Sequence, residues 1–346
     1  MKTAPAAVEG NIRGRRVFVV FLPGNGVHCR FCILKRNSPK TDALVKSRQD
    51  YLTQKPNLSL GKSNLAGEIG LFAKYDFSGK VVVITGGASG IGLAFARRAA
   101  KAGAAVALLD RNEAALAECE KAFAANGHKI IVRACDVSVR AQCDAAMGDA
   151  IGQFGGIDVL FNNAGITQRS QFADTRPEVF EKVMAVNFFG ALYCTKAAID
   201  SIIRRKGMIL VNESIAGIAP LVGRTGYSAS KHAMHGLFTS LGAELRQKGV
   251  HVMIVCPGFI ETNLQKTALG ADGSVTNRPQ TFIGRKDTPE SAAEKIYRGA
   301  CRKKRLLVLT FMGKLGVWVH TFAPGYYEKK MARLFEAELQ ENHDER

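Results

Sequence analysis

The chain has 346 residues, 47% of them hydrophobic, so it is long enough to bury the core of one large domain or two ordinary ones. Its formal net charge of +18 is uneven. Residues 1–77 carry 13 basic against 5 acidic side chains, and residues 264–346 carry 15 against 10. The excess therefore lies mainly in the flanks. Charge alone is a weak argument for a nucleic-acid partner, so we expect none.

An apolar run, Val17–Leu22, follows basic residues near the start of the chain. It is shorter than the apolar core of a secretory leader and too short to span a bilayer, so no signal peptide is predicted. The eight cysteines are scattered, which favours a reducing, cytoplasmic compartment. Only Cys29 and Cys32 have a C-x-x-C spacing, and His28 is the one further ligand nearby. A zinc site needs four ligands, so we predict no metal.

Residues 1–76 show no sustained periodicity, because basic residues, prolines and glycines interrupt each apolar run. We interpret this segment as a poorly ordered basic extension. A second interpretation stays open. No methionine occurs between Met1 and Met147, so a true start at a non-Met codon near Leu71 would leave the segment out of the native protein.

From Phe77 the chain alternates short apolar runs with helical stretches. Strands are predicted at residues 81–84, 105–109, 129–134, 159–161, 208–211, 251–256 and 306–309. Helices are predicted at residues 91–102, 113–126, 140–154, 177–205, 227–248 and 289–302. Strands separated by helices form parallel βαβ units. Residues 77–310 are therefore predicted to be one α/β domain with a Rossmann-type doubly wound parallel sheet, in which ligands bind at the carboxyl ends of the strands.

A glycine-rich turn joins the first predicted strand to the first helix. Gly86, Gly90 and Gly92 let the backbone turn tightly and approach a pyrophosphate. The helix that starts at Ile91 points its N-terminal amides at that anion. The turn therefore predicts a dinucleotide site.

The second predicted strand ends at Asp110, about 20 residues past the glycine turn, where an acidic residue binds ribose hydroxyls. A carboxylate there repels a 2′-phosphate, which favours NAD over NADP. Arg111 beside it can accept that phosphate, so NADP stays open as the alternative.

Tyr227 and Lys231 are four residues apart, which places both on one face of a predicted helix. A nearby ammonium favours the phenolate form, so the phenol can exchange a proton with an alcohol or ketone. Ser214, at the end of a strand, is placed to hold the substrate oxygen. Asn187 is polar within an apolar helix. We interpret it as a group that kinks the helix and positions water for a proton relay, and the alternative is a satisfied buried amide.

These residues resemble the short-chain dehydrogenase/reductase family over about residues 77–310. The matching motifs are the turn Thr85–Gly92, the N-N-A-G stretch Asn162–Gly165, and the catalytic set Asn187, Ser214, Tyr227 and Lys231. The resemblance implies that Tyr227 and Lys231 also contact the cofactor, Lys231 at the ribose. Further cofactor contacts are implied at Gly86, Ser89, Gly90, Ile91, Gly92, Asp110, Arg111, Asp136, Val137, Asn163, Ala164, Gly165, Pro257, Gly258, Ile260 and Thr262.

Two features depart from the family pattern. Glu213 precedes the catalytic serine, where the family usually has a serine or another small residue, and we expect it to alter the pocket wall or the pH profile. The glycine-rich C-terminal segment that helps family members form tetramers is absent. We therefore expect a homo-oligomer, and a dimer rather than a tetramer.

The chain ends in a tail, residues 311–346, that is rich in apolar and basic residues. It follows the basic run Arg302–Arg305, and an amphipathic helix is predicted from Tyr326 to Leu339. Apolar residues beside basic ones suit a membrane surface, and the alternative is packing on the domain or on a second subunit. The tail resembles those of family members that act on lipophilic substrates, and residues 263–286 occupy the place of the family's substrate lid.

Together these observations predict an enzyme that transfers hydride between NAD(H) and a secondary alcohol or ketone, with a hydrophobic small molecule as substrate. An alternative is an NADPH-dependent 3-oxoacyl thioester reductase. An alternative from another class is a nucleotide-sensing binding protein without turnover.

Overall fold

The structure, a computed structural model, describes residues 6–12, 15–22, 30–35, 74–276, 281–282, 284 and 286–336. The chain divides into two compact units, residues 1–71 and 72–346. The first unit contains β1 (Ala6–Ile12), β2 (Arg15–Leu22) and β3 (Arg30–Lys35), paired antiparallel in the order β1-β2-β3. These strands were not predicted from the sequence, although β2 contains the apolar run Val17–Leu22. Cys29 lies outside the described residues, and so does the side chain of Cys32.

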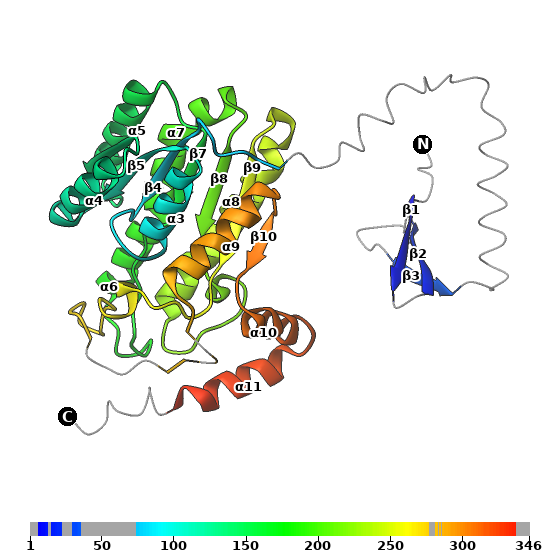
Figure 1. The fold of residues 1–346 in the computed structure, drawn as a ribbon. Helices are drawn as coiled ribbons and strands as arrows, with labels where there is room; N and C mark the ends of the chain where they lie inside the picture. The colour runs from blue at the N-terminus through cyan, green and yellow to red at the C-terminus, as the bar shows by residue number, and fades with distance from the viewer. Residues whose placement is uncertain are drawn as a thin grey trace, which may run out of the picture. The chain divides into compact units, whose positions relative to one another are not determined.

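The second unit is built on a seven-stranded parallel sheet in the order β10-β9-β8-β7-β4-β5-β6 (Figure 1). Its strands are β4 (Val81–Thr85), β5 (Ala105–Asp110), β6 (Ile130–Ala134), β7 (Val159–Asn162), β8 (Met208–Asn212), β9 (His251–Cys256) and β10 (Leu306–Val308). The chain runs outward from β4 to β6, then returns to β7 on the other side of β4. The predicted doubly wound sheet is therefore confirmed, and its switch point lies between β4 and β7.

Helices cover both faces of this sheet. One face carries α3 (Gly90–Lys101), α4 (Glu113–Ala125) and α9 (Pro289–Cys301). The other carries α5 (Arg140–Phe154), α7 (Gly190–Arg204) and α8 (Thr225–Leu245). Because both faces are buried, the strands are almost continuously apolar rather than alternating.

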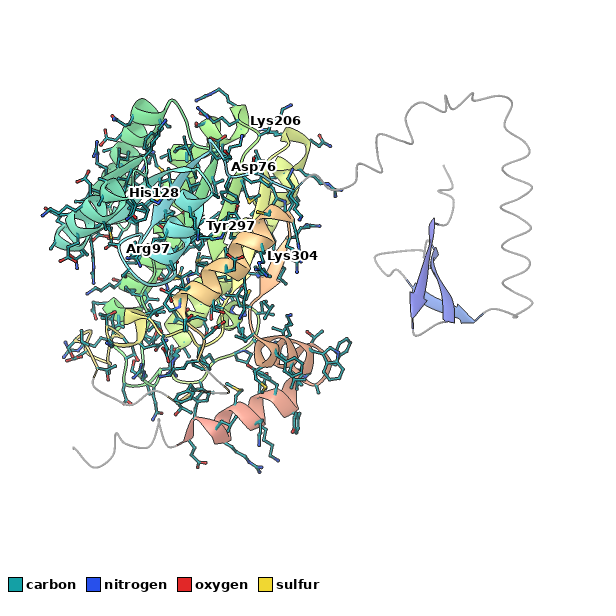
Figure 2. The ribbon with its side chains drawn as sticks, viewed as in Figure 1. Asp76, Arg97, His128, Lys206, Tyr297 and Lys304 are labelled. Carbon is teal, nitrogen blue, oxygen red and sulfur yellow. The ribbon has the colours of Figure 1, made fainter. Side chains whose placement is uncertain are left out.

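Neighbouring residues of β4 show how the core is divided. Val82 and Ile84 pack against the α3 face, whereas Val83 packs against the α8 face. On the first face α9 lies against α3, and the guanidinium of Arg98 lies 3.5 Å from the ring centroid of Tyr297, which Figure 2 labels on α9. The two buried layers therefore pack the sheet from both sides.

The predicted helix over residues 177–205 is interrupted in its middle. It consists of α6 (Pro177–Met184), a π-helical turn (Ala185–Phe189) and α7. Asn187 lies within the π turn and is fully buried. Such a turn adds a residue to the helical ladder and is frequent at functional sites.

Two helices follow β10. α10 (Phe311–Phe322) and α11 (Pro324–Leu334) contact each other and meet at Ala323 and Pro324, where α10 ends. The apolar stretch before Pro324 is thus a helix in its own right, which the sequence analysis did not specify. Among the residues that the structure describes, no helix combines the length and apolar character needed to cross a bilayer.

Candidate active site

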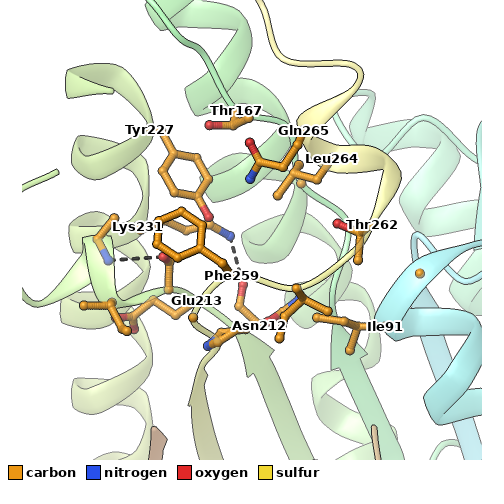
Figure 3. Close-up of a pocket in the computed structure, with 18 of the residues that line it drawn as sticks. Ile91, Thr167, Asn212, Glu213, Tyr227, Lys231, Phe259, Thr262, Leu264 and Gln265 are labelled. Carbon is orange, nitrogen blue, oxygen red and sulfur yellow. Dashed lines mark hydrogen bonds between the residues drawn. The ribbon is translucent and has the colours of Figure 1, made fainter. Parts of the chain in front are cut away.

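A pocket of about 1150 Å³ lies at the carboxyl ends of the strands and extends to α10 and α11. All of the site residues predicted from the sequence line it except Gly92 and Asn187. Figure 3 shows part of this pocket, with Tyr227 and Lys231 on one side and Thr262, Leu264 and Gln265 on a loop across from them. The predicted cofactor-binding and catalytic residues therefore lie together at the switch point of the sheet.

The glycine turn between β4 and α3 is packed too closely for side chains. A Cβ on Gly86 would lie 2.9 Å from Ala164 Cα, and one on Gly92 would lie 2.3 Å from the carbonyl oxygen of Gly86. Gly86 and Gly90 also have positive φ angles of 61° and 54°. Gly92 therefore closes the turn from behind, while Gly86 and Gly90 line the pocket.

Asn163 fixes the glycine turn from the neighbouring strand. Its side-chain amide donates to the carbonyl oxygens of Thr85 and Gly86 at 3.0 and 3.1 Å. The hydroxyl of Thr85 in turn accepts from the backbone N–H groups of Asn163 and Ala164, each at 3.0 Å. These bonds join the ends of β4 and β7, which are 78 positions apart in sequence. The role of Thr85 as an anchor was not predicted.

Asp110, at the end of β5, faces the same turn. Its carboxylate accepts hydrogen bonds from the backbone N–H groups of Ala88 and Asn112, both at 3.1 Å. At the end of β6, the carboxylate of Asp136 accepts from the backbone and hydroxyl of Ser138, and this hydrogen bonding lowers the pKa of Asp136. Both carboxylates line the pocket beside Arg111.

These features fit a nicotinamide dinucleotide. The glycine cradle leaves backbone room for a pyrophosphate at the N-terminus of α3, where Ser89 is the N-cap residue and makes no side-chain cap bond. Asp110 would hold the adenosine ribose, Asp136 and Val137 would contact the adenine, and the segment from Pro257 to Thr262 would flank the nicotinamide end. A Cβ on Gly90 would lie 3.3 Å from the side chain of Thr262, so the two parts of this cradle are close together.

Tyr227 and Lys231 lie in the first two turns of α8 and are almost completely buried. Lys231 Nζ is 5.6 Å from the centroid of the Tyr227 ring and donates to the carbonyl oxygen of Asn212 at 2.9 Å. Ser214 caps a short 3₁₀ turn after β8, and its hydroxyl accepts from the backbone N–H of Ala216 at 3.1 Å. The structure therefore brings the predicted serine, tyrosine and lysine together.

Burial dominates the protonation of this group. It raises the pKa of Tyr227 to about 12, although a hydrogen bond to Ser214 and the charge of Arg224 act in the opposite direction. Burial also lowers the pKa of Lys231 to about 8, which the charge of Glu213 opposes. The lysine ammonium is therefore only moderately stable near neutral pH.

Asn187 lies behind the pocket rather than in it. Its side-chain oxygen accepts from the backbone N–H of Ile166 at 2.8 Å, and its amide donates to the carbonyl of Ile166 at 3.0 Å and to the hydroxyl of Ser230 at 2.9 Å. The amide is thus a satisfied buried group within the π turn, and it joins the loop after β7 to α8. The relay role proposed from the sequence stays a prediction.

One wall of the pocket is formed by residues that were not predicted from the sequence as site residues. Apolar side chains of α10 and α11 line it, namely Phe311, Met312, Leu315, Val319, Tyr327, Met331 and Leu334. Arg169 donates to the backbone and side-chain oxygens of Gln265, which also lines the pocket, at 3.2 and 3.1 Å and so holds the loop after Thr262. The apolar composition of the tail was the only feature of the sequence that pointed to this wall of the pocket.

Comparison with known proteins matches this geometry. The family model described as short chain dehydrogenase matches residues 80–271. The chain belongs to the short-chain dehydrogenase family. It is therefore an oxidoreductase of that family, whose members act on small molecules. The resemblance predicted from the motifs is confirmed.

Several relatives are similar over most of the chain. "Dehydrogenase/reductase SDR family member 7B" of Bos taurus is 34% identical and covers 87% of this chain and 97% of its own length. A "Dehydrogenase/reductase SDR family protein 7-like" of Drosophila melanogaster is 32% identical over 74% of this chain and 80% of its own.

Solved structures show the same fold. A short-chain dehydrogenase/reductase from Burkholderia phymatum, in complex with NAD, is 26% identical with a TM-score of 0.66, over 73% of this chain and 96% of its own. An alcohol dehydrogenase from Thermococcus sibiricus, complexed with 5-hydroxy-NADP, is 26% identical with a TM-score of 0.57. The match covers 66% of this chain and 94% of that protein.

Proposed function

We propose that this chain transfers hydride reversibly between NAD(H) and a lipophilic secondary alcohol or ketone, with Tyr227 as the acid/base group. The observation that carries the proposal is the convergence of Tyr227, Lys231 and Ser214 at one end of a pocket whose other wall is apolar. A bound nicotinamide supplies or accepts the hydride. The side chains described here bind the substrate oxygen and handle the proton.

In the direction of ketone reduction, the Ser214 hydroxyl donates a hydrogen bond to the substrate oxygen, and the Tyr227 hydroxyl delivers the proton to it. Lys231, fixed on the carbonyl oxygen of Asn212, keeps a positive charge beside the phenol and stabilises the phenolate that results. In alcohol oxidation the same groups act in reverse. Only 8% of Tyr227 is exposed, which limits the access of bulk water to this exchange.

Asp110 supports NAD as the preferred cofactor. Its two carboxylate oxygens are anchored by the backbone at Ala88 and Asn112, so the negative charge is held at the end of β5 and is not free to turn away. A fixed carboxylate repels a 2′-phosphate and accepts hydrogen bonds from ribose hydroxyls. Arg111 lines the same part of the pocket, and NADP therefore remains the alternative cofactor.

The proposal is tested by a screen of hydrophobic alcohols and ketones against the oxidised and reduced forms of both cofactors, read at the nicotinamide absorbance. We expect turnover of apolar secondary alcohols or ketones with NAD(H). Acetoacetyl thioesters reduced faster with NADPH would favour the thioester reductase instead. Tight cofactor binding without turnover of any substrate would favour a nucleotide-sensing protein.

We further propose that α10 contacts a membrane surface. Phe311, Leu315, Trp318 and Phe322 recur at spacings of four and three residues, which places them on one side of the helix, here called the apolar α10 face. Phe311, Trp318 and Phe322 are 76%, 60% and 71% exposed. Phe311 and Leu315 also line the pocket, so the face adjoins the pocket wall that would receive a lipophilic substrate.

Charge on the two helices suits an anionic lipid surface. α10 and α11 carry Lys314, Lys329, Lys330 and Arg333 against Glu328. An in-plane helix with aromatic residues on one face and nearby basic residues binds at the headgroup level. The separate run of basic residues before β10, marked by Lys304 in Figure 2, lies at the opposite end of that strand from α10.

Co-sedimentation with vesicles tests this contact. We expect the protein to bind phosphatidylcholine vesicles that contain phosphatidylserine, and the double variant Trp318→Ser/Phe322→Ser to lose binding. Phe172→Ser is the matched control, because Phe172 is 70% exposed and lies outside the pocket. Unchanged binding of the double variant would contradict the proposal. Loss of a dimer in that variant would instead assign the face to a second subunit, which is the alternative that the sequence left open for the tail.

A further inference from the structure

Glu213, the residue that departs from the family pattern, is a completely buried carboxylate. Its Oε2 and Oε1 lie 3.1 and 3.2 Å from Nδ1 of His235, and the Cys256 thiol is 3.9 Å from Oε1. The next residue is Ser214, which we place on the substrate oxygen. A charged group buried beside the reacting atoms is costly unless it is paired or protonated.

The fold provides a fitted space for this carboxylate. A Cβ on Gly217 would lie 2.2 Å from Glu213 Oε1 and 2.8 Å from its Cγ, so the side chain occupies the room left by that glycine. Gly217 ends the 3₁₀ turn that Ser214 caps. The backbone N–H of Glu213 also donates to the carbonyl oxygen of Val255 at 2.8 Å, which fixes the residue between β8 and β9. Glu213 is thus held firmly against the catalytic turn.

His235 extends the catalytic face of α8. Tyr227, Lys231 and His235 follow one another at four-residue spacings, so they lie along one side of the helix. The His235 side chain is 34% exposed, whereas that of Glu213 is 0% exposed. His235 therefore connects a buried carboxyl group to solvent, one turn beyond the lysine.

We propose that Glu213 and His235 form an acid–imidazole pair that sets the charge beside Tyr227 and Lys231 and thereby tunes the pH range of the reaction. Glu213 is a positioning residue in this scheme, because it acts through the lysine and the tyrosine. The inference rests on the function proposed above. It goes beyond it by assigning a role to a pair that the Ser–Tyr–Lys chemistry does not use.

The groups around Glu213 define what its ionisation does. Burial raises the pKa of Glu213 to about 8, and the positive charge of Lys231 opposes this rise. On α8, burial lowers the pKa of His235, and the neighbouring His232 adds to this effect. On β9, burial raises the pKa of the Cys256 thiol, which stays neutral. In the neutral range the pair therefore holds one proton and carries no net charge.

Loss of that proton places a negative charge beside the catalytic groups. This charge raises the pKa of both Lys231 and Tyr227. Lys231 therefore keeps its ammonium to a higher pH than burial alone would allow. If Glu213 is replaced by Gln, the negative charge never forms. The alkaline limb of the rate profile should then move to lower pH, with a severalfold loss of kcat/KM for ketone reduction at about pH 9 and little change near neutral pH.

The first test is the pH profile of kcat/KM for Glu213→Gln in the full chain. Glu213→Ser is a second variant, because it restores the kind of small residue that the family usually carries here. Glu244→Gln is the matched control, since Glu244 lies exposed on the same helix. An acid shift in both Glu213 variants, with the control profile unchanged, supports the proposal. If both Glu213 variants keep the pH profile of the wild type, the proposal is overturned.

The second test does not depend on turnover. The chain has seven histidines, and the NMR signal of His235 is identified by its loss in His235→Gln. We expect the His235 ring signal to move at about pH 8, when Glu213 ionises, and this movement to vanish in Glu213→Gln. A signal without that movement in the wild type overturns the proposal. A signal that behaves as expected in a protein without turnover would overturn the proposed function alone.

Discussion

Lys231 Nζ donates a hydrogen bond to the carbonyl oxygen of Asn212 at 2.9 Å. This bond joins the catalytic helix α8 to the carboxyl end of β8, two residues before Ser214. The backbone that positions the serine thus also positions the ammonium that Tyr227 requires. The Asn212 side chain in addition donates to Asn163 at 2.9 Å, which links this corner to the cofactor turn.

Tyr227→Phe should abolish turnover while cofactor binding is retained. The substitution removes the only atom of Tyr227 that can carry the proton and leaves the ring in its buried place. General acid–base groups contribute about 10²–10⁴-fold, so we expect kcat to fall by at least about 100-fold. Steady-state kinetics and fluorescence titration of NADH measure the two quantities. Tyr193→Phe is the control, because Tyr193 lies on α7 and outside the pocket. Near-normal turnover of Tyr227→Phe would contradict the assignment of Tyr227 as the acid/base group.

Asp110→Ser should shift cofactor preference toward NADPH. The change removes the carboxylate that Ala88 and Asn112 fix at the end of β5, and with it the repulsion of a 2′-phosphate. We expect the ratio of kcat/KM for NADH over NADPH to fall by about tenfold, which corresponds to about 1.4 kcal/mol. Asp144→Ser, an exposed acid on α5, should leave the ratio unchanged. An unchanged ratio in Asp110→Ser would show that another group selects the cofactor.

Asn187→Ala should destabilise the fold. It leaves the part-buried N–H and carbonyl of Ile166 without their side-chain partners, and each such loss costs about 1–3 kcal/mol. Urea unfolding followed by circular dichroism measures the loss, which we expect to exceed about 2 kcal/mol in total. Asn126→Ala is the control, because Asn126 makes an exposed bond at the end of α4. If Asn187→Ala is as stable as the wild type, the π turn does not depend on the Asn187 amide.

Local spacing explains what the sequence alone could predict. The glycine turn and the Tyr227–Lys231 pair are patterns within a few residues, and the βαβ alternation placed them at the ends of strands. The partners of Asn187 lie 21 and 43 positions away, and His235 lies 22 positions from Glu213. Such contacts exist only once the sheet has formed, so no spacing in the sequence reveals them.

The pocket wall formed by α10 and α11 was missed for a related reason. An apolar stretch of this length has several packing solutions, and only the turn at Pro324 directs α11 back along the pocket. The strands β1–β3 were missed because their apolar runs are short and are separated by basic residues, prolines and glycines, so residues 1–76 show no sustained periodicity.

The ionisation of Glu213 should also be visible in stability. Its pKa rises from 4.5 to about 8 on folding, chiefly through burial, so the folded state binds more protons than the unfolded state between these values. Stability rises with pH only where the unfolded state binds more protons, so this contribution is fully present below about pH 4.5 and is lost as pH rises toward 8. Lys231 acts in the opposite sense, because its lowered pKa makes stability rise with pH from about 8 to 10.5.

Urea unfolding at a series of pH values measures this linkage. We expect the stability of Glu213→Gln to fall less steeply than that of the wild type between about pH 5 and 8, because the amide has no proton to lose. Glu244→Gln should follow the wild type, since that carboxyl is exposed on α8. Parallel curves for Glu213→Gln and the wild type would mean that the buried carboxyl does not change its protonation in this range, and that another group carries the slope.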